Sequence, residues 1–218
     1  MDGGCGLSTG CAHECVHLPN LLRSIRMDFW DYLSAFGDPF LTLPLAAAIV
    51  VWLAIKGSRR IALAWAAFFC LAVLLVGVTK FAYAGWGIAI EAVHFTVISG
   101  HTMLSSAVYP IAFYLCAHGA GKRLTRWAVC CGIGFALLIG ISRVMVGAHS
   151  QSEVIVGWLL GFAISGMLLK KLEHVARPVS PSVGFFATCM ATAVTCYGHA
   201  APIQAWIIDT APQLAHHL

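Results

Sequence analysis

The sequence Ser142-Arg143-x5-His149-x3-Glu153 places residues of complementary chemistry at fixed spacing in the second half of the chain. His149 and Glu153 are four residues apart, so on a helix their side chains would share a face. A carboxylate in that position can hold one imidazole nitrogen protonated and leave the other nitrogen as a nucleophile. Arg143 can bind phosphate oxygens through its guanidinium fork. The spacing therefore predicts nucleophilic chemistry on a phosphate group.

A second polar group comes earlier, with Ser99-Gly100-His101 and, upstream, Lys80. Lys80 would supply fixed positive charge. Ser99 and the Gly100 N–H stand just ahead of a predicted helix, where free backbone donors and the helix dipole favour an anion. His101 could protonate a departing alkoxide. Together the two groups predict a phosphate cradle, a nucleophile, an orienting carboxylate and an acid.

The composition indicates which solvent surrounds these residues. Of 218 residues, 60% are hydrophobic and only 10% are charged, and the mean hydropathy is +0.84. Soluble domains have about 45–50% apolar and about 25% charged residues. So few charged residues cannot cover the surface of a soluble protein of this size. Most of the surface must therefore face lipid. The net charge of +4 is small and dispersed, which argues against nucleic-acid binding.

Six apolar segments predict an all-α, integral membrane six-helix bundle. Several are short for the roughly 17–25 residues that a spanning helix needs, and flanking Trp, Lys and Arg would extend them. The segments are 39–55, 61–79, 102–117, 127–141, 154–169 and 183–208. The last is interrupted by Tyr197-Gly198-His199 and by Pro202, so where it ends is left open.

Three regions follow along the chain. Residues 1–38 would form an N-terminal tail ending in an interfacial amphipathic helix at 21–36, where apolar and charged residues alternate at helical spacing. Residues 39–208 would form the membrane domain, and 209–218 a C-terminal tail. Residues 1–20 show no signal-peptide pattern. Their cysteines and histidines match no zinc pattern, so we expect no metal there and leave open a disordered or crosslinked tail.

The cations predict the orientation in the membrane. Nine of the 13 lysines and arginines fall in one set of connections, which the positive-inside rule places in the cytoplasm. The chemistry-bearing residues then lie at the outer, periplasmic face. The nine are Lys56, Arg59, Arg60, Lys122, Arg123, Arg126, Lys170, Lys171 and Arg177.

These motifs, in this order, resemble the type 2 phosphatidic acid phosphatase superfamily, whose three motifs read Lys-x6-Arg-Pro, Pro-Ser-Gly-His and Ser-Arg-x5-His-x3-Asp. The direct resemblance runs from about Lys80 to Glu153. By position it implies that His149 is the nucleophile that forms a phosphohistidine and that His101 is the general acid. Ser142 would have a supporting role.

The resemblance also assigns the phosphate-binding set and implies that no metal or other cofactor is needed. That set is Lys80, Ser99, Gly100 and Arg143.

The chain departs from the family motifs at three places. Glu153 replaces the orienting Asp with one extra methylene, which keeps charge and hydrogen-bonding capacity. Ile98 replaces the Pro before Ser99. The Arg expected seven residues after Lys80 is Gly87, so one phosphate contact of about 1.5–3 kcal/mol would be missing. Three candidates for its place stay open: Glu91 or His94 of the following apolar stretch, or a water molecule.

The resemblance predicts a membrane phosphatase acting on a lipid-linked phosphate or pyrophosphate. Undecaprenyl pyrophosphate is slightly favoured, while phosphatidic acid, phosphatidylglycerol phosphate and lipid A phosphates are compatible. Two alternatives stay open: a lipid phosphotransferase of the same fold, and a low-activity lipid-binding or transport protein. The expected partners are the lipid phosphate substrate and membrane lipids, with no nucleic acid and no obligate protein partner.

Overall fold

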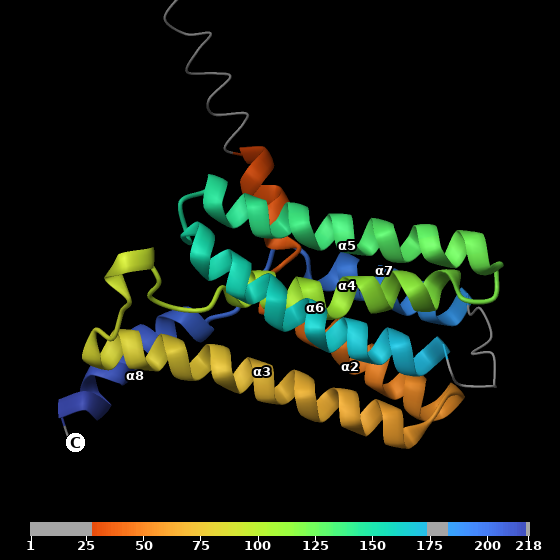
Figure 1. The fold of residues 1–218 in the computed structure, drawn as a ribbon, viewed down its shortest axis with the longest axis horizontal. Coiled ribbons are helices and arrows are strands. Elements are labelled where there is room, and N and C mark those ends of the chain that lie inside the picture. The colour runs from red at the N-terminus through yellow and green to blue at the C-terminus, as the bar shows by residue number, and fades with distance from the viewer. Residues whose placement is uncertain (1–27, 174–182, 217–218) are drawn as a thin grey trace, which may run out of the picture.

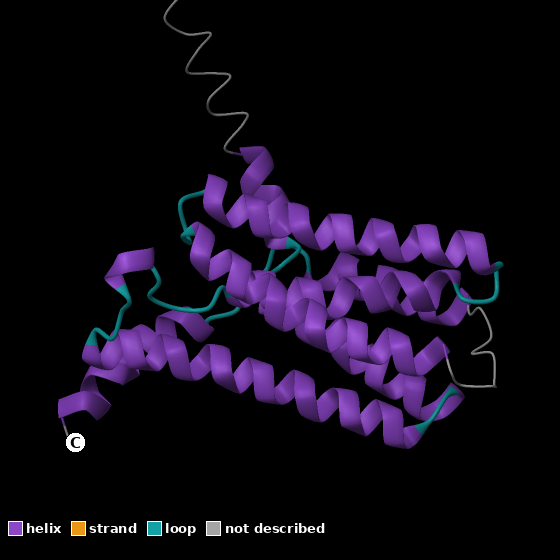
Figure 2. Cartoon of the chain, in the orientation of Figure 1, coloured by secondary structure: helices purple, strands orange, loops and turns teal. Residues whose placement is uncertain are grey.

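The computed structural model describes residues 28–173 and 183–216, and within them the chain is all-helical. Figures 1 and 2 show long helices packed side by side, joined by short loops. A short 3-10 turn, η1 (Glu91–Val93), lies in the connection between α3 and α4. The predicted all-α class is confirmed. The helices are α2 (Pro39–Lys56), α3 (Arg59–Trp86), α4 (Gly100–Ala117), α5 (Lys122–Met145), α6 (Gln151–Glu173), α7 (Val183–Cys196) and α8 (Ile203–His216).

Four helical stretches in the described part of the chain are long and apolar enough to cross a membrane. They cover the first, second, fourth and fifth predicted spans, so the chain is a membrane protein, whereas a count of six spans is not confirmed. The third predicted span is α4, whose buried polar side chains include Thr102, Ser105 and Ser106. The four stretches are Asp28–Lys56, Arg59–Trp86, Lys122–Met145 and Gln151–Leu172.

The prediction of one last span over 183–208 is wrong, because the structure divides this segment into α7 and α8. Gly198 has a left-handed backbone with φ of 82°, and Pro202 cannot continue a preceding helix. The 14 residues of α7 extend over only about 21 Å, less than the roughly 30 Å of a hydrocarbon core. Because α8 continues to His216, most of the predicted C-terminal tail is helical.

The N-terminal region is described from residue 28 onward. Residues 28–35 are helical, and the interfacial amphipathic helix at 21–36 stays a prediction. Its first half, and the cysteine- and histidine-rich segment, lie outside the described residues. A turn then leads to Asp38, which caps α2: its Oδ1 accepts a hydrogen bond from the Phe40 N–H at 2.7 Å. Pro39 follows at the first helical position, where a missing N–H costs nothing.

Helix α4 is central, and α6 packs closely against it. A Cβ atom added to Gly157 would lie 3.0 Å from the Ser99 carbonyl oxygen and 3.0 Å from Thr102 Cβ. A Cβ on Gly161 would lie 2.6 Å from Ser106 Cβ. Small residues allow such close backbone approach between membrane helices. The two glycines therefore set the position of the start of α6 relative to the start of α4.

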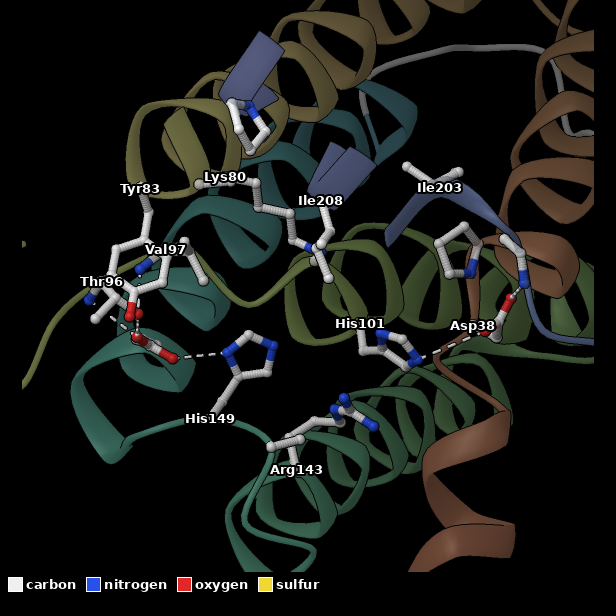
Figure 3. Close-up of a pocket in the computed structure, with 17 residues that line it drawn as sticks. Asp38, Lys80, Tyr83, Thr96, Val97, His101, Arg143, His149, Ile203 and Ile208 are labelled. Atoms are coloured by element: carbon white, nitrogen blue, oxygen red, sulfur yellow. Dashed lines mark hydrogen bonds and ion pairs between the residues drawn. The ribbon is translucent and has the colours of Figure 1, made fainter. Parts of the chain in front are cut away.

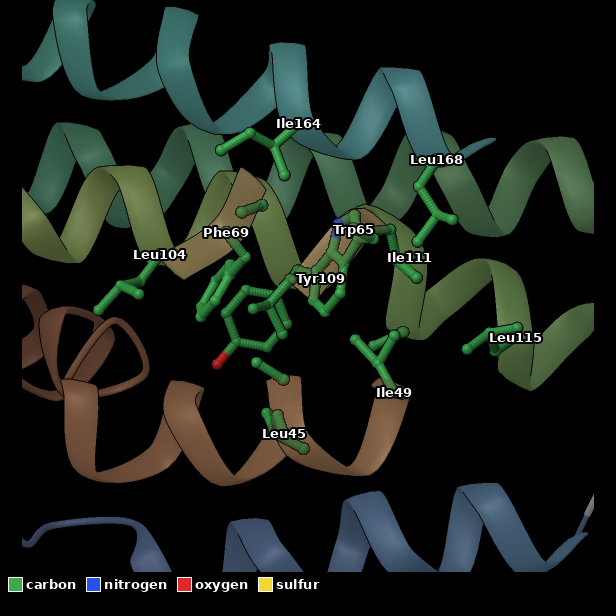
Figure 4. Packing of buried hydrophobic residues seen from close by; sticks show 14 of the residues in the cluster. Leu45, Ile49, Trp65, Phe69, Leu104, Tyr109, Ile111, Leu115, Ile164 and Leu168 are labelled. Atoms are coloured by element: carbon green, nitrogen blue, oxygen red, sulfur yellow. The ribbon is translucent and has the colours of Figure 1, made fainter. Parts of the chain in front are cut away.

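The rest of the core consists of apolar side chains from α2 to α7, most of them from α2, α3, α4 and α6 (Figure 4). They meet around α4, with Leu45 and Ile49 on one side and Ile164 and Leu168 on another. Since lipid tails are as apolar as these side chains, close packing rather than water exclusion holds the helices together inside a membrane.

The two ends of the bundle differ in charge. The α2–α3 and α4–α5 connections and the end of α6 lie at one end (right in Figure 1), and they carry most of the cations singled out from the sequence. The end of α3, the start of α4 and the α5–α6 turn lie toward the other end, beside α8. The helical hairpins thus bring residues from distant parts of the sequence to one level.

Candidate active site

A cavity of about 610 Å³ opens at the less basic end of the bundle (Figure 3). Side chains from α3, α4, α5 and α6 line it, together with the turn before α2 and the segment before α4. Apolar residues of α8 form part of its wall. The polar lining residues are Asp38, Lys80, Tyr83, Thr96, His101, Arg143, His149 and Glu153.

His149 and Glu153 form the pair that their spacing predicts. His149 Nδ1 lies 2.6 Å from Glu153 Oε2, and their side chains are 10% and 5% exposed. With an ionised carboxylate as the acceptor, Nδ1 is the protonated nitrogen and Nε2 carries the lone pair. Figure 3 shows the other edge of the ring turned toward His101. The imidazole is therefore oriented as a nucleophile would need to be.

Glu153 is held by four donor groups besides His149. Its Oε1 accepts hydrogen bonds from the Thr96 N–H at 2.9 Å, the Val97 N–H at 3.2 Å and the Thr96 hydroxyl. Its Oε2 also accepts the Ser150 N–H at 3.2 Å. Donors to the charged form stabilise a buried carboxylate. The segment before α4 thus fixes the carboxylate that in turn fixes His149.

The surroundings keep the His149 imidazole neutral. Burial lowers the pKa of His149, and the positive charge of Arg143 acts in the same direction, while the hydrogen bond with Glu153 opposes them. The net effect is a pKa below the ordinary histidine value of about 6.5. His149 is therefore neutral near pH 7 and available for attack.

Two cations adjoin this pair, Lys80 on α3 and Arg143 on α5. Arg143 Nη1 donates to the Ser34 hydroxyl at 2.5 Å, whereas its buried Nε has no hydrogen-bond partner among the described residues. Such a donor costs about 1–3 kcal/mol unless something accepts from it. Lys80 Nζ approaches the start of α4, where a Cβ on Gly100 would lie 3.9 Å from it. This part of the cavity is suited to an anion.

His101 lies on the same cavity, one residue into α4. Figure 3 shows its ring between the His149 ring and the Asp38 carboxylate. Its Nε2 is 3.7 Å from Asp38 Oδ2, and the His101 side chain is 21% exposed. Both histidines named by the sequence therefore reach one cavity.

The two predicted serines do not line the cavity. Ser99 is buried, its hydroxyl is 2.9 Å from that of Thr102, and its N–H donates to the Glu153 carbonyl oxygen. A phosphate contact from Ser99 stays a prediction, and it would require these groups to rearrange. Ser142 is also buried, and its hydroxyl donates to the Ile139 carbonyl oxygen at 2.6 Å. Its place within α5 is consistent with support rather than substrate contact.

The position of the missing Arg is a helix end. Gly87 terminates α3 in the left-handed conformation, with φ of 65°, which favours glycine over residues with a side chain. Neither Gly87 nor the two residues considered as substitutes, Glu91 and His94, is among the lining residues, and both substitutes are exposed. The cationic side chains that line the cavity, among the described residues, are therefore Lys80 and Arg143.

Sequence reasoning missed three parts of the site. Nothing in the sequence around Thr96 indicates its contact with Glu153. Asp38 carries a helix-start signal, Asp before Pro, but nothing that points to His101. The third is the apolar wall of α8, formed by Ile203, Ile208 and Pro212. In residues 28–173 and 183–216, no cluster of three or more His, Cys, Asp or Glu side chains is arranged to hold a metal ion.

Comparison with known proteins identifies relatives. The family model described as the PAP2 superfamily matches residues 83–175. An "uncharacterized 22.5 kDa protein in cps region" of Klebsiella pneumoniae is 37% identical over 157 residues, covering 72% of this chain and 75% of that protein. No solved structure shows a significant match.

Two relatives have named activities. The undecaprenyl-diphosphatase of Sulfolobus acidocaldarius is 28% identical over 167 residues, covering 67% of this chain and 74% of that protein. The phosphatidylglycerophosphatase B of Bacillus subtilis is 37% identical over 86 residues, covering 38% and 42%. The matched region contains the cavity's two histidines, Arg143 and Glu153, and on these grounds the chain belongs to the PAP2 superfamily.

Proposed function

We propose that this chain is a membrane phosphatase that hydrolyses a lipid-linked phosphate or pyrophosphate through a phosphohistidine intermediate. The observation that supports it best is the His149–Glu153 pair, which shares a cavity with two cations and a second histidine. A carboxylate on Nδ1 raises the electron density on Nε2 and keeps the ring from turning. The cavity therefore holds groups to which we assign the roles of nucleophile, phosphate site and acid.

In the first step, His149 Nε2 attacks phosphorus. The N–P bond forms as the P–O bond to the lipid breaks, and the leaving oxygen keeps the electron pair and takes a proton from His101. In the second step, neutral His101 takes a proton from a water molecule whose oxygen attacks phosphorus. The N–P bond breaks, inorganic phosphate is released, and both histidines return to their starting protonation states. Most of the catalysis would come from positioning and from neutralising charge on the equatorial oxygens.

Lys80 and Arg143 are the groups we assign to those oxygens, with the Gly100 N–H at the start of α4. The unpartnered Arg143 Nε supports this assignment, since a phosphate oxygen would accept from it. Two fixed cations can supply the charge that a metal supplies elsewhere. We therefore propose a metal-independent reaction, and EDTA should leave the rate unchanged.

The lipid part of the substrate would contact the apolar wall of the cavity. Ile203, Ile208 and Pro212 of α8 line the cavity together with the polar residues. An undecaprenyl pyrophosphate is slightly favoured as substrate, in line with the Sulfolobus relative's name. Phosphatidylglycerol phosphate, phosphatidic acid and lipid A phosphates are also compatible with a site that recognises phosphate beside an apolar surface.

We further propose a location in the inner membrane, with the cavity at the periplasmic face. The cation-rich connections at the opposite end of the bundle support this orientation. The membrane phosphatase domain would comprise residues 39–208 extended by α8. In a cysteine-free background, an impermeant thiol reagent should label a cysteine at Ser150 from outside, but not one at Arg123. The opposite labelling pattern would reverse the orientation.

The function is tested by phosphate release from a panel of lipid phosphates with purified protein. Wild type should act on at least one lipid without an added acceptor, which also distinguishes hydrolysis from phosphotransfer. His149→Ala should reduce the rate about 10⁴-fold or more. His118→Ala, at the far end of α4, serves as the matched control and should retain the wild-type rate. Equal release by wild type and His149→Ala would refute the phosphatase proposal.

A further inference from the structure

We propose that Asp38 is a positioning residue for His101, holding its ring toward the cavity and sustaining the protonated form that delivers the proton. The inference rests on the proposed function and adds a residue that belongs to none of the three sequence motifs. Asp38 Oδ2 lies 3.7 Å from His101 Nε2, with the Asp38 side chain 14% exposed. This is within the distance of an ion pair, and it leaves Nδ1 of His101 for the substrate.

The position of Asp38 is fixed from several directions. Its Oδ1 accepts hydrogen bonds from the Phe40 N–H at 2.7 Å and from the Ala201 N–H at 3.1 Å, the latter just before α8. Two residues earlier, the Phe36 carbonyl oxygen accepts a hydrogen bond from the Tyr109 hydroxyl of α4 at 2.6 Å. These contacts hold the carboxylate in place independently of His101. A group that positions another side chain needs such independent support.

The turn before Asp38 is packed directly against His101. A Cβ on Gly37 would lie 3.0 Å from His101 Cβ and 2.7 Å from Ile139 Cγ2. Any side chain at this position would push the turn away from α4 and α5. The glycine thus allows the carboxylate to approach the histidine.

Charge explains why His101 needs such a partner. The cavity also contains Lys80 and Arg143, and two nearby positive charges disfavour a third on an imidazole. Among the described residues that line the cavity, the carboxylates are Asp38 and Glu153. Glu153 is already committed to His149 and to the segment before α4. Asp38 is the carboxylate that faces His101.

Asp38 acts during the proton transfer from His101 to the leaving lipid oxygen. Protonated His101 gives its proton to the lipid oxygen as the P–O bond breaks and the N–P bond to His149 forms. His101 is left neutral, and Asp38 remains ionised throughout. Asp38 therefore affects only the step in which a proton is delivered, and its effect should grow with the basicity of the leaving group.

The test replaces Asp38 by Asn, which keeps both Oδ1 hydrogen bonds and remains a good helix cap while removing the charge. Asp38→Asn should lower kcat for an alkyl lipid phosphate about tenfold, a part of the roughly 10²–10⁴-fold that a general acid contributes. It should leave KM and the rate with p-nitrophenyl phosphate nearly unchanged, because that leaving group needs little proton transfer. In a His101→Ala background, Asp38→Asn should have no further effect.

Two other variants keep the experiment decisive. Asp38→Glu retains the charge and should restore part of the rate, and Asp28→Asn, at an exposed position outside the cavity, should behave as wild type. Equal slowing of both substrates, or an undiminished effect in the His101→Ala background, would overturn the role of Asp38 alone. Equal activity of wild type and His149→Ala would overturn the phosphatase function and this role together.

Discussion

The two histidines of the cavity are supported in different ways. On one side, His149 is bonded to Glu153 at 2.6 Å, and Glu153 accepts four further hydrogen bonds from Thr96, Val97 and Ser150. On the other side, His101 faces Asp38 at 3.7 Å, and the carboxylate is anchored to backbone groups rather than to the ring. The side of His149, the proposed nucleophile, is locked by direct hydrogen bonds, whereas the side of His101, the proposed acid, has a charge held nearby.

This difference fits the two tasks. A nucleophile must keep one tautomer and one direction during attack, so a bonded carboxylate is an advantage. An acid must lose and regain a proton in each turnover. A strong hydrogen bond that favours one protonation state would therefore slow conversion to the other. Substitutions on the nucleophile side should therefore slow every substrate, whereas those on the acid side should slow only substrates with basic leaving groups.

The largest difference is expected from His101→Ala. Loss of the acid should lower kcat for an alkyl lipid phosphate by about 10²–10⁴-fold, but by much less for p-nitrophenyl phosphate. Steady-state rates with the two substrates measure this selectivity. If both substrates slow equally, His101 is not the proton donor and the comparison fails.

Glu153→Gln should slow both substrates by about 10²-fold, because the amide nitrogen cannot accept the hydrogen bonds that the carboxylate accepts. The pH profile gives a second readout. Since the lowered pKa of His149 puts the acid limb of kcat/KM below about pH 6.5 in wild type, and Glu153 opposes that lowering, its loss should move the limb to still lower pH. A limb that moves upward would contradict the pairing.

Arg143→Lys should have an intermediate effect, since a lysine keeps the charge but loses the planar fork. Losing one charged hydrogen bond of about 1.5–3 kcal/mol corresponds to roughly 10–100-fold in kcat/KM. The loss should be similar for alkyl and aryl phosphates, because both carry the same phosphoryl group. A loss confined to one of them would mean that Arg143 contacts the leaving group instead.

Thr96→Val is the mildest test of the nucleophile side. It removes the hydroxyl that donates to Glu153 but keeps the backbone N–H donor. A loss of about 0.5–1.5 kcal/mol predicts a roughly 2–12-fold lower kcat, equal for both substrates. Thr210→Val, on the exposed part of α8 where the hydroxyl bonds only its own helix, is the matched control and should not change the rate.

Several features were predictable because they depend on neighbours along the chain. The lipid-facing surface follows from composition, and the starts of the long helices follow from apolar runs. The pairing of His149 with Glu153 follows from a separation of four residues, although His149 itself lies just before α6. In the segment 183–208 the sequence shows the interruption around Gly198, but it does not show that two separate helices, α7 and α8, flank it. Apolarity alone does not reveal a left-handed turn.

The sequence by itself determined that this is a membrane-embedded, all-helical chain with a histidine–carboxylate pair and nearby cations, because each of these depends on residue types and local spacing. Only the tertiary structure decided which distant groups support them. Thr96 and Glu153 are 57 residues apart, and Ser34 and Arg143 are 109 apart. Such contacts, like that of Asp38 with His101, exist because the glycines of α6 and the turn at Gly37 bring backbones close together, and close approach is a property of packed helices rather than of any one segment.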